Sequence, residues 1–410
     1  MTPEQALALA DALADPAGPN LRSGKQWWRQ SLAHGVPGIA LLHAEAAAAG
    51  LRPFERVHAW LTVATSGPVT TGASTGLLYG APALSFVLAA AATARPGTYR
   101  AAVAALEEAV ATDARRRAAA GLERIATGEL PELAEFDAIR GLAGIGAHLL
   151  HGDPHGPALR DVLGYLARLA EPLTGPGGRP VPGWWTADGP GGRPDAEFPG
   201  GHGNFGMGHG IAGPLALAAL AAIRGVTVPG QLEAIGTWCG WLDEWRIDTP
   251  AGPRWPYMVT LAELEDPPAA VAHSGARRRP SWCYGTAGLA RAQQLAALAL
   301  GDPGRRRLAE HALLTALSDP GQLSKTLDAS LCHGFTGLAH IAALAADDAP
   351  EPEAAPLRRL ATELLDRAPL PDPADGPGLL EGSAGTALAA LAPSLGKQPA
   401  TGWATRFLIA

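Results

Sequence analysis

A short glycine-containing phrase occurs seven times along this 410-residue chain. Each copy carries two glycines three residues apart, except that one copy ends in alanine, and a run of apolar residues follows each of them. The copies are HGVPG at 34–38, YGAPA at 79–83, RGLAG at 140–144, HGIAG at 209–213, YGTAG at 284–288, HGFTG at 333–337 and EGSAG at 381–385. Because Gly permits positive φ and close backbone approach, the phrase is typical of a turn that enters a packed helix.

The spacing of the phrases predicts an all-α chain of helical hairpins. Successive first glycines are 45, 61, 69, 75, 49 and 48 residues apart. Units of about 45–50 residues accommodate two helices with their turns, and the three longer intervals leave room for insertions. Consecutive hairpins that bury a face against their neighbours form an open solenoid or a closed ring. Repetition alone leaves both possibilities open.

Composition excludes several classes of protein. Hydrophobic residues make up 47% of the chain and charged residues 17%, so a large core is expected and extensive disorder is excluded. The net charge of −7 argues against a nucleic-acid partner. The longest apolar runs, at 81–94 and 210–223, are too short for a transmembrane segment. An acidic start in place of a basic signal region and an odd number of cysteines, three, favour a reducing, cytoplasmic location.

The residue before the first glycine of each phrase is ionisable or phenolic in all seven copies. These residues are His34, Tyr79, Arg140, His209, Tyr284, His333 and Glu381. In a solenoid they would form a stripe, and in a ring they would converge on a central mouth. A single such residue is ordinarily a solvent-facing cap, but seven in register favour a lined cavity.

Two cysteines and a histidine share the register of adjacent phrases. Cys283 and Cys332 each lie two residues before the first glycine of a phrase, and His333 follows Cys332 directly. Thiolate and imidazole ligands suit zinc, and three protein ligands leave one position open, as in catalytic sites. The alternative is two inert buried cysteines beside a capping histidine. Cys239 lies outside the repeat register.

These motifs resemble the lanthionine synthetase C-like family, the standalone cyclases of class I lanthipeptide biosynthesis. The matching segments are SWCYGTAGLA at 281–290, LCHGFTGLAHI at 331–341, GMGHGIAG at 206–213 and FDAIRGLAG at 136–144. The resemblance implies an α/α toroid of paired helices with zinc at its centre. We expect one such domain over 1–410, with insertions near 172–201 and 241–268 that form loops or small hairpins.

The resemblance also implies a reaction and its partners. Family members add a peptide cysteine to dehydroalanine or dehydrobutyrine in the same peptide, which gives lanthionine or methyllanthionine rings. We therefore expect one Zn²⁺ per chain, a dehydrated precursor peptide as substrate and a lanthipeptide dehydratase as partner. The protein would act in the cytoplasm, either alone or within a membrane-associated biosynthetic complex.

Site residues follow by matching the family's motifs. Cys283, Cys332 and His333 correspond to the zinc ligands. The acid/base and enolate-stabilising positions correspond to His209, Asp137, Arg279 and Tyr284. Two of these have simpler interpretations, because Asp137 could be an N-cap and Arg279 could belong to a solvated arginine run that begins at Arg277.

Two other functions fit part of the pattern. A prenyltransferase-like toroid also activates a thiol on zinc, but its ligand set includes an aspartate and lacks the cysteine–histidine pair in repeat register. A non-catalytic, zinc-containing scaffold that binds peptides is the second alternative.

Overall fold

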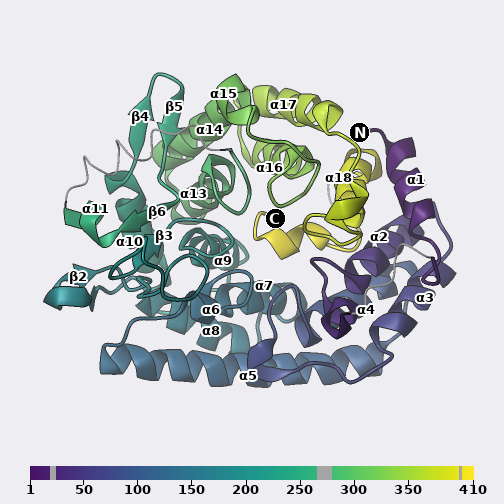
Figure 1. Ribbon diagram of the computed structural model, residues 1–410, viewed down its shortest axis with the longest axis horizontal. Helices are drawn as coiled ribbons and strands as arrows, with labels where there is room; N and C mark the ends of the chain where they lie inside the picture. The colour runs from purple at the N-terminus through teal and green to yellow at the C-terminus, as the bar shows by residue number, and fades with distance from the viewer. Residues whose placement is uncertain (19–24, 266–278, 397–398) are drawn as a thin grey trace. The chain divides into compact units, whose positions relative to one another are not determined.

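In the computed structural model, a helix begins directly after the first glycine of every phrase, or one residue later. The structure describes residues 1–18, 25–265, 279–396 and 399–410. We call these seven helices the phrase helices, and Figure 1 labels each of them. They are α2 (Val36–Ala48), α4 (Ala81–Ala94), α7 (Leu142–Gly152), α9 (Ala212–Ile223), α13 (Thr286–Leu300), α16 (Phe335–Asp348) and α18 (Ser383–Leu395). The repeat in the sequence therefore corresponds to a repeated structural element.

The second glycine of the phrase is required by a close approach between backbone segments. A Cβ added at Gly288 would stand 2.1 Å from the carbonyl oxygen of Trp282, and one at Gly337 would stand 2.1 Å from that of Leu331. No side chain fits at such a distance, because the obstacle is backbone. Trp282 and Leu331 immediately precede Cys283 and Cys332. The glycine thus lets each cysteine-bearing turn lie against the first turn of its helix.

One or two other described α-helices lie between successive phrase helices along the chain, and α1 precedes the first of them. These other helices are α1 (Pro3–Ala12), α3 (Glu55–Ala64), α5 (Arg100–Thr127), α6 (Leu133–Phe136), α8 (Pro157–Arg168), α10 (Gln231–Glu244), α11 (Leu261–Glu265), α14 (Pro303–Ser318), α15 (Pro320–Leu323) and α17 (Ala354–Arg367). The phrase helix α2 is buried on all sides from Val36 to Ala46. On α8, by contrast, the buried residues recur at helical spacing and leave one exposed face, the pattern of an amphipathic helix.

The chain divides into two compact units. The first contains Met1–Asp113, Leu327–His340 and Arg359–Arg406, and the second contains Ala114–Thr326, Ile341–Arg358 and Phe407–Ala410. In the first unit α2 packs against α3, α4 and α18, and α1 packs against α18. In the second unit α13 packs against α9 and α14, and α10 packs against α8 and α9. The single domain expected from the sequence stays a prediction.

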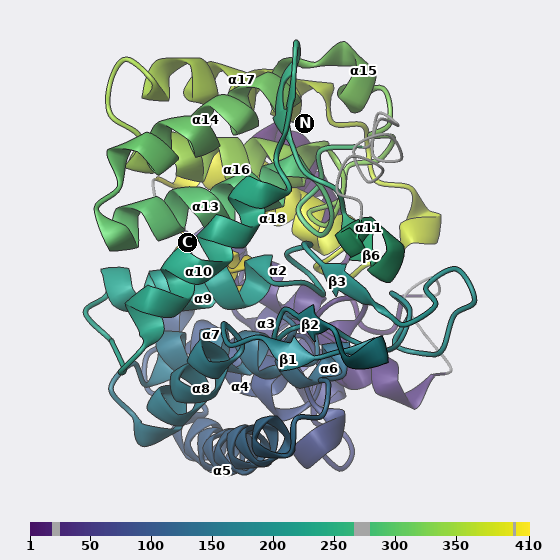
Figure 2. The ribbon, with the colours of Figure 1, turned by 90° about the vertical axis from the view of Figure 1, so that its left-hand side faces the viewer.

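Short antiparallel strand pairs occur in the two expected insertions and beside them (Figures 1 and 2). The first insertion contains the pair β1 (Leu173–Thr174) with β2 (Pro180–Val181), and the second contains β4 (Ile247–Thr249) with β5 (Gly252–Arg254). A third pair joins β3 (His202–Asn204) to β6 (Met258–Thr260). Residues 266–268 of the second insertion lie outside the described residues. The expected small β excursions are confirmed.

Within the residues that the structure describes, every helix is too short or too polar to cross a membrane.

Candidate metal centre and active site

Backbone hydrogen bonds connect neighbouring phrase turns in the second unit. The amide of Ala138 donates to the carbonyl of Gly208 at 3.1 Å, and the amide of Gly208 donates to the carbonyl of Cys283 at 3.3 Å. The turns that carry Asp137, His209 and Cys283 are therefore consecutive neighbours. This arrangement brings together residues that are separated by up to 146 positions in the sequence.

The first unit contains an equivalent series of turns. The amide of Cys332 donates to the carbonyl of Leu380 at 3.0 Å, and the amide of Leu380 donates to the carbonyl of Ala33 at 2.9 Å. Cys332 and His333 therefore belong to a turn whose backbone is fixed by its neighbour. A metal ligand on such a turn has little freedom of position.

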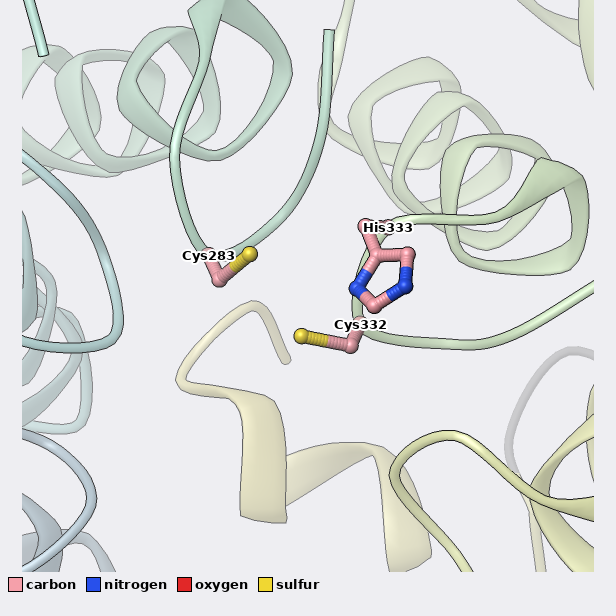
Figure 3. A group of neighbouring side chains, drawn as sticks. All are labelled: Cys283, Cys332 and His333. Atoms are coloured by element: carbon pink, nitrogen blue, oxygen red, sulfur yellow. The ribbon is translucent and has the colours of Figure 1, made fainter. Parts of the chain in front are cut away.

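Cys283, Cys332 and His333 form a group that can hold a metal ion. Their ligand atoms all lie within 4.8 Å of one another, and Figure 3 shows the two sulfurs and one ring nitrogen of His333 facing the same space. Neither cysteine is in a disulfide. Two thiols with one imidazole are ligands that zinc favours. The grouping predicted from the phrase register is thus present.

Cys239 does not belong to this group. It is buried on α10, and burial raises the pKa of its thiol to about 11. A thiol in such surroundings stays protonated and unreactive at neutral pH.

Serine hydroxyls shape the two ligand-bearing turns. The hydroxyl of Ser330 accepts the backbone N–H of His333 at 3.2 Å. The thiol of Cys283 lies 3.8 Å from the hydroxyl of Ser281, which occupies the corresponding position in its own phrase. These local bonds orient the turns from which the ligands project.

Asp328 contacts the imidazole of His333. Its Oδ2 lies 3.3 Å from Nε2 of the ring, and its Oδ1 accepts the backbone N–H of Ser330 at 2.8 Å. The carboxylate is therefore anchored on one side and faces the histidine on the other. Sequence reasoning missed this residue, because the residue at this position varies from phrase to phrase, as Arg29 and Gly376 show.

Asp137 holds His209 and its own turn at once. Its Oδ2 accepts Nδ1–H of His209 at 2.6 Å. Its Oδ1 accepts the backbone N–H groups of Ile139, Arg140 and Gly141 at 3.1, 2.6 and 2.7 Å. The N-cap of α7 is Gly141, so Asp137 is not the helix N-cap that the sequence offered as an alternative. Its side chain holds the turn before α7 and contacts His209 at the same time.

The pKa of His209 is raised above its ordinary value. Burial of the ring lowers this pKa, but the hydrogen bond and charge of Asp137, together with the charge of Cys283, outweigh burial. The imidazole therefore keeps its proton to a higher pH than a free histidine. Because Asp137 occupies Nδ1, the other ring nitrogen, Nε2, is the one that remains for proton exchange.

Tyr284 lies beside His209, on the phrase turn that carries Cys283. The two ring centroids are 6.4 Å apart, and the Tyr284 hydroxyl accepts a hydrogen bond from the side-chain amide of Asn204 at 3.1 Å. Asn204 therefore holds the phenol oxygen on its acceptor side. Asn204 lies on β3, inside a non-repeat segment, and no sequence signal identified it.

Arg279 is half-buried, two residues before the Ser281 turn. Its backbone carbonyl accepts the Tyr257 hydroxyl at 2.8 Å, and the Tyr257 ring lies 5.8 Å from that of Tyr284. The backbone of Arg279 is therefore fixed beside the tyrosines. Arg277, where the arginine run begins, lies outside the described residues.

The chain belongs to the lanthionine synthetase C-like protein family, whose model matches residues 26–408. The structure is similar to that of nisin cyclase, with a TM-score of 0.77 and 19% sequence identity, over 99% of this chain and 96% of that one. No protein in the curated set matches the sequence. The structural likeness shows a shared fold, and it confirms the all-α, α/α-toroid class expected from the sequence.

Proposed function

We propose that this protein is a zinc-dependent lanthipeptide cyclase that forms lanthionine and methyllanthionine rings. One observation carries the proposal: Cys283 belongs to the group of two thiols and one imidazole, and its turn is the direct neighbour of the turn that carries His209. The group supplies metal ligands, and the neighbouring turn supplies a proton donor held by Asp137. Family membership favours this function over a prenyltransferase-like enzyme or a peptide-binding scaffold.

The metal would be held by Cys283, Cys332 and His333. Zinc held by these three ligands would supply a position for a substrate thiol and would lower the pKa of that thiol, so that the thiolate would be available at neutral pH. The protein groups around it then have two tasks. They must stabilise the charge that develops during addition, and they must deliver a proton.

The bonds balance without a redox co-reactant. The sulfur of the peptide cysteine forms a C–S bond to the β-carbon of dehydroalanine or dehydrobutyrine, and the C=C π bond breaks. Its electron pair moves to the α-carbon and the adjacent carbonyl oxygen as an enolate. A proton added to the α-carbon completes the thioether, so the product has the same mass as the linear peptide.

His209 is the proton donor in this proposal. Its raised pKa favours the protonated ring, and Asp137 fixes Nδ1 so that Nε2 is directed to the reaction. The neutral ring left after this donation takes up, at the same nitrogen, the proton that the next substrate thiol loses, which returns the ring to its starting state. Positioned proton transfer of this kind contributes about 100- to 10,000-fold to rate.

Arg279 and Tyr284 are proposed to stabilise the enolate oxygen. A guanidinium supplies positive charge, and a phenol supplies a hydrogen-bond donor where negative charge develops. Asn204 holds the Tyr284 hydroxyl on its acceptor side. Arg279 lies four residues before Cys283 and Tyr284 directly follows it, so both are close in sequence to a proposed metal ligand.

The remaining expectations are part of the same proposal. The substrate is a dehydrated precursor peptide, a dehydratase supplies it, and one Zn²⁺ is bound per chain. We propose a single α/α-toroid domain that acts in the cytoplasm, either alone or within a membrane-associated biosynthetic complex.

The reaction is tested by incubating the zinc-loaded protein with its dehydrated precursor peptide. Thiol alkylation followed by mass spectrometry should show loss of free thiols with no change in peptide mass. In two controls the peptide should keep all its thiols: one in which the protein has been boiled, and one in which the peptide retains serine in place of dehydroalanine. Equal alkylation with and without the active protein would contradict the proposal.

A further inference from the structure

Asp328 stands beside the metal group without belonging to it. It lies five residues before His333, and its carboxylate contacts that ring at Nε2 across 3.3 Å. Both side chains are about a quarter exposed or less, at 26% for Asp328 and 21% for His333, so solvent screens their interaction only partly. Its other oxygen is anchored on the amide of Ser330.

A second turn in the same unit shows that the backbone does not need this carboxylate. Residues 31–35 read Ser-Leu-Ala-His-Gly, and residues 330–334 read Ser-Leu-Cys-His-Gly. In both turns the histidine amide donates to the serine hydroxyl, at 3.1 Å for His34 and 3.2 Å for His333. At the position of Asp328 the first turn has Arg29. The same turn thus forms with a basic residue there, so turn formation does not account for Asp328.

We propose that Asp328 is a positioning residue that accepts the Nε2 proton of His333 and thereby presents Nδ1 to the metal. The inference rests on the zinc site of the proposed function. A neutral imidazole carries its proton on one nitrogen and binds a metal through the other. Carboxylates that hold the second nitrogen of a ligating histidine fix the ring and its tautomer. In Figure 3 one ring nitrogen faces the two sulfurs and the other lies on the far side of the ring.

An asparagine at this position tests the effect on the His333 ring while the hydrogen bond that holds the turn is kept. In Asp328→Asn the amide oxygen can still accept from Ser330, so the turn is preserved. The NH₂ group then faces Nε2, which must accept a hydrogen bond and so moves the ring proton to Nδ1. That tautomer cannot bind the metal through Nδ1. Asp328→Ala removes both contacts but leaves the tautomer free to adjust.

The test is the zinc affinity of purified protein, measured by chelator competition in the absence of peptide. We expect both variants to bind zinc about 10- to 100-fold more weakly than the wild type, with Asp328→Asn at least as weak as Asp328→Ala. The thermal stability of metal-depleted Asp328→Asn should equal that of metal-depleted wild type. Asp372→Asn is the matched control, since Asp372 also accepts a backbone amide, from Ala374 at 2.8 Å.

Three outcomes are distinguishable. Wild-type zinc affinity in Asp328→Asn would overturn the inference, and so would a loss of affinity matched by a loss of stability in the metal-depleted protein. Failure of the wild type itself to bind zinc would instead defeat the proposed function. Co²⁺ substitution gives a second readout, because the thiolate charge-transfer absorption should persist in Asp328→Asn at saturating Co²⁺ while the bands sensitive to the nitrogen ligand change.

Discussion

His209 and His333 occupy the same position of the repeated phrase, yet a carboxylate contacts a different nitrogen of each ring. Asp137 binds Nδ1 of His209 at 2.6 Å, whereas Asp328 lies 3.3 Å from Nε2 of His333. Each aspartate uses its other oxygen to accept backbone amides of the same turn. A carboxylate that also holds its own turn therefore contacts Nδ1 in one copy and Nε2 in the other.

The two pairs also differ in burial of the carboxylate. The Asp137 side chain is 1% exposed and that of Asp328 is 26% exposed. A buried charge acts strongly on its partner, which agrees with the raised pKa of His209. The comparison supports the proposal that the more buried pair transfers protons and that the pair beside the thiols binds the metal.

The largest effect is expected from removal of a thiol ligand. Cys283→Ala and Cys332→Ala should lose bound zinc, and cyclisation should fall by more than about 100-fold, because loss of a ligand exceeds the effect of disturbing its support. Elemental analysis of the purified variants gives the metal content. Cys239→Ala, which changes a buried thiol outside the group, should keep both zinc and activity. Unchanged metal content in both ligand variants would remove the site assignment.

A smaller effect is expected from Asp137→Asn. The amide oxygen can still cap the turn, but loss of the charge lowers the pKa of His209. The protonated ring is then lost at a lower pH, so the alkaline limb of kcat/KM should move to lower pH. Activity at neutral pH should fall by about 10- to 100-fold, part of what a positioned proton donor contributes. An unshifted pH profile would show that Asp137 serves only as a cap.

The smallest effect on chemistry is expected from Gly337→Ala. The new Cβ would stand 2.1 Å from the Leu331 carbonyl oxygen, so the backbone before Cys332 must move. We expect this shift to lower the free energy of unfolding by about 1–3 kcal/mol. Thermal denaturation should show a lower Tm, with zinc affinity modestly reduced. Gly236→Ala is the control, since nothing lies within 4 Å of its added Cβ and the helix should gain up to about 1 kcal/mol. Equal Tm in wild type and Gly337→Ala would refute the packing argument.

The repeat made the helices and the thiol group predictable. Glycine pairs at helical-hairpin spacing located the starts of the phrase helices, and the shared register of Cys283 and Cys332 predicted their convergence. Family motifs pointed to His209 and Asp137, although not to the hydrogen bond between them. These features leave a local or periodic trace in the sequence.

Asp328, Asn204 and the pairing of β3 with β6 left no such trace. The strand pair joins His202 to Thr260, 58 residues apart, by contacts that depend on the fold. Asn204 reaches Tyr284 only because β3 is placed beside that turn. Asp328 and Arg29 occupy the same position in two phrases, and only the structure shows that Asp328 contacts the imidazole of His333.

The division of labour between the two histidines is tested most directly by measuring zinc content and thiol loss side by side in His209→Ala and His333→Ala. The account predicts that His209→Ala retains one zinc per chain and loses ring formation, whereas His333→Ala loses zinc and activity together. Loss of zinc from His209→Ala, or full zinc retention in His333→Ala, would contradict it.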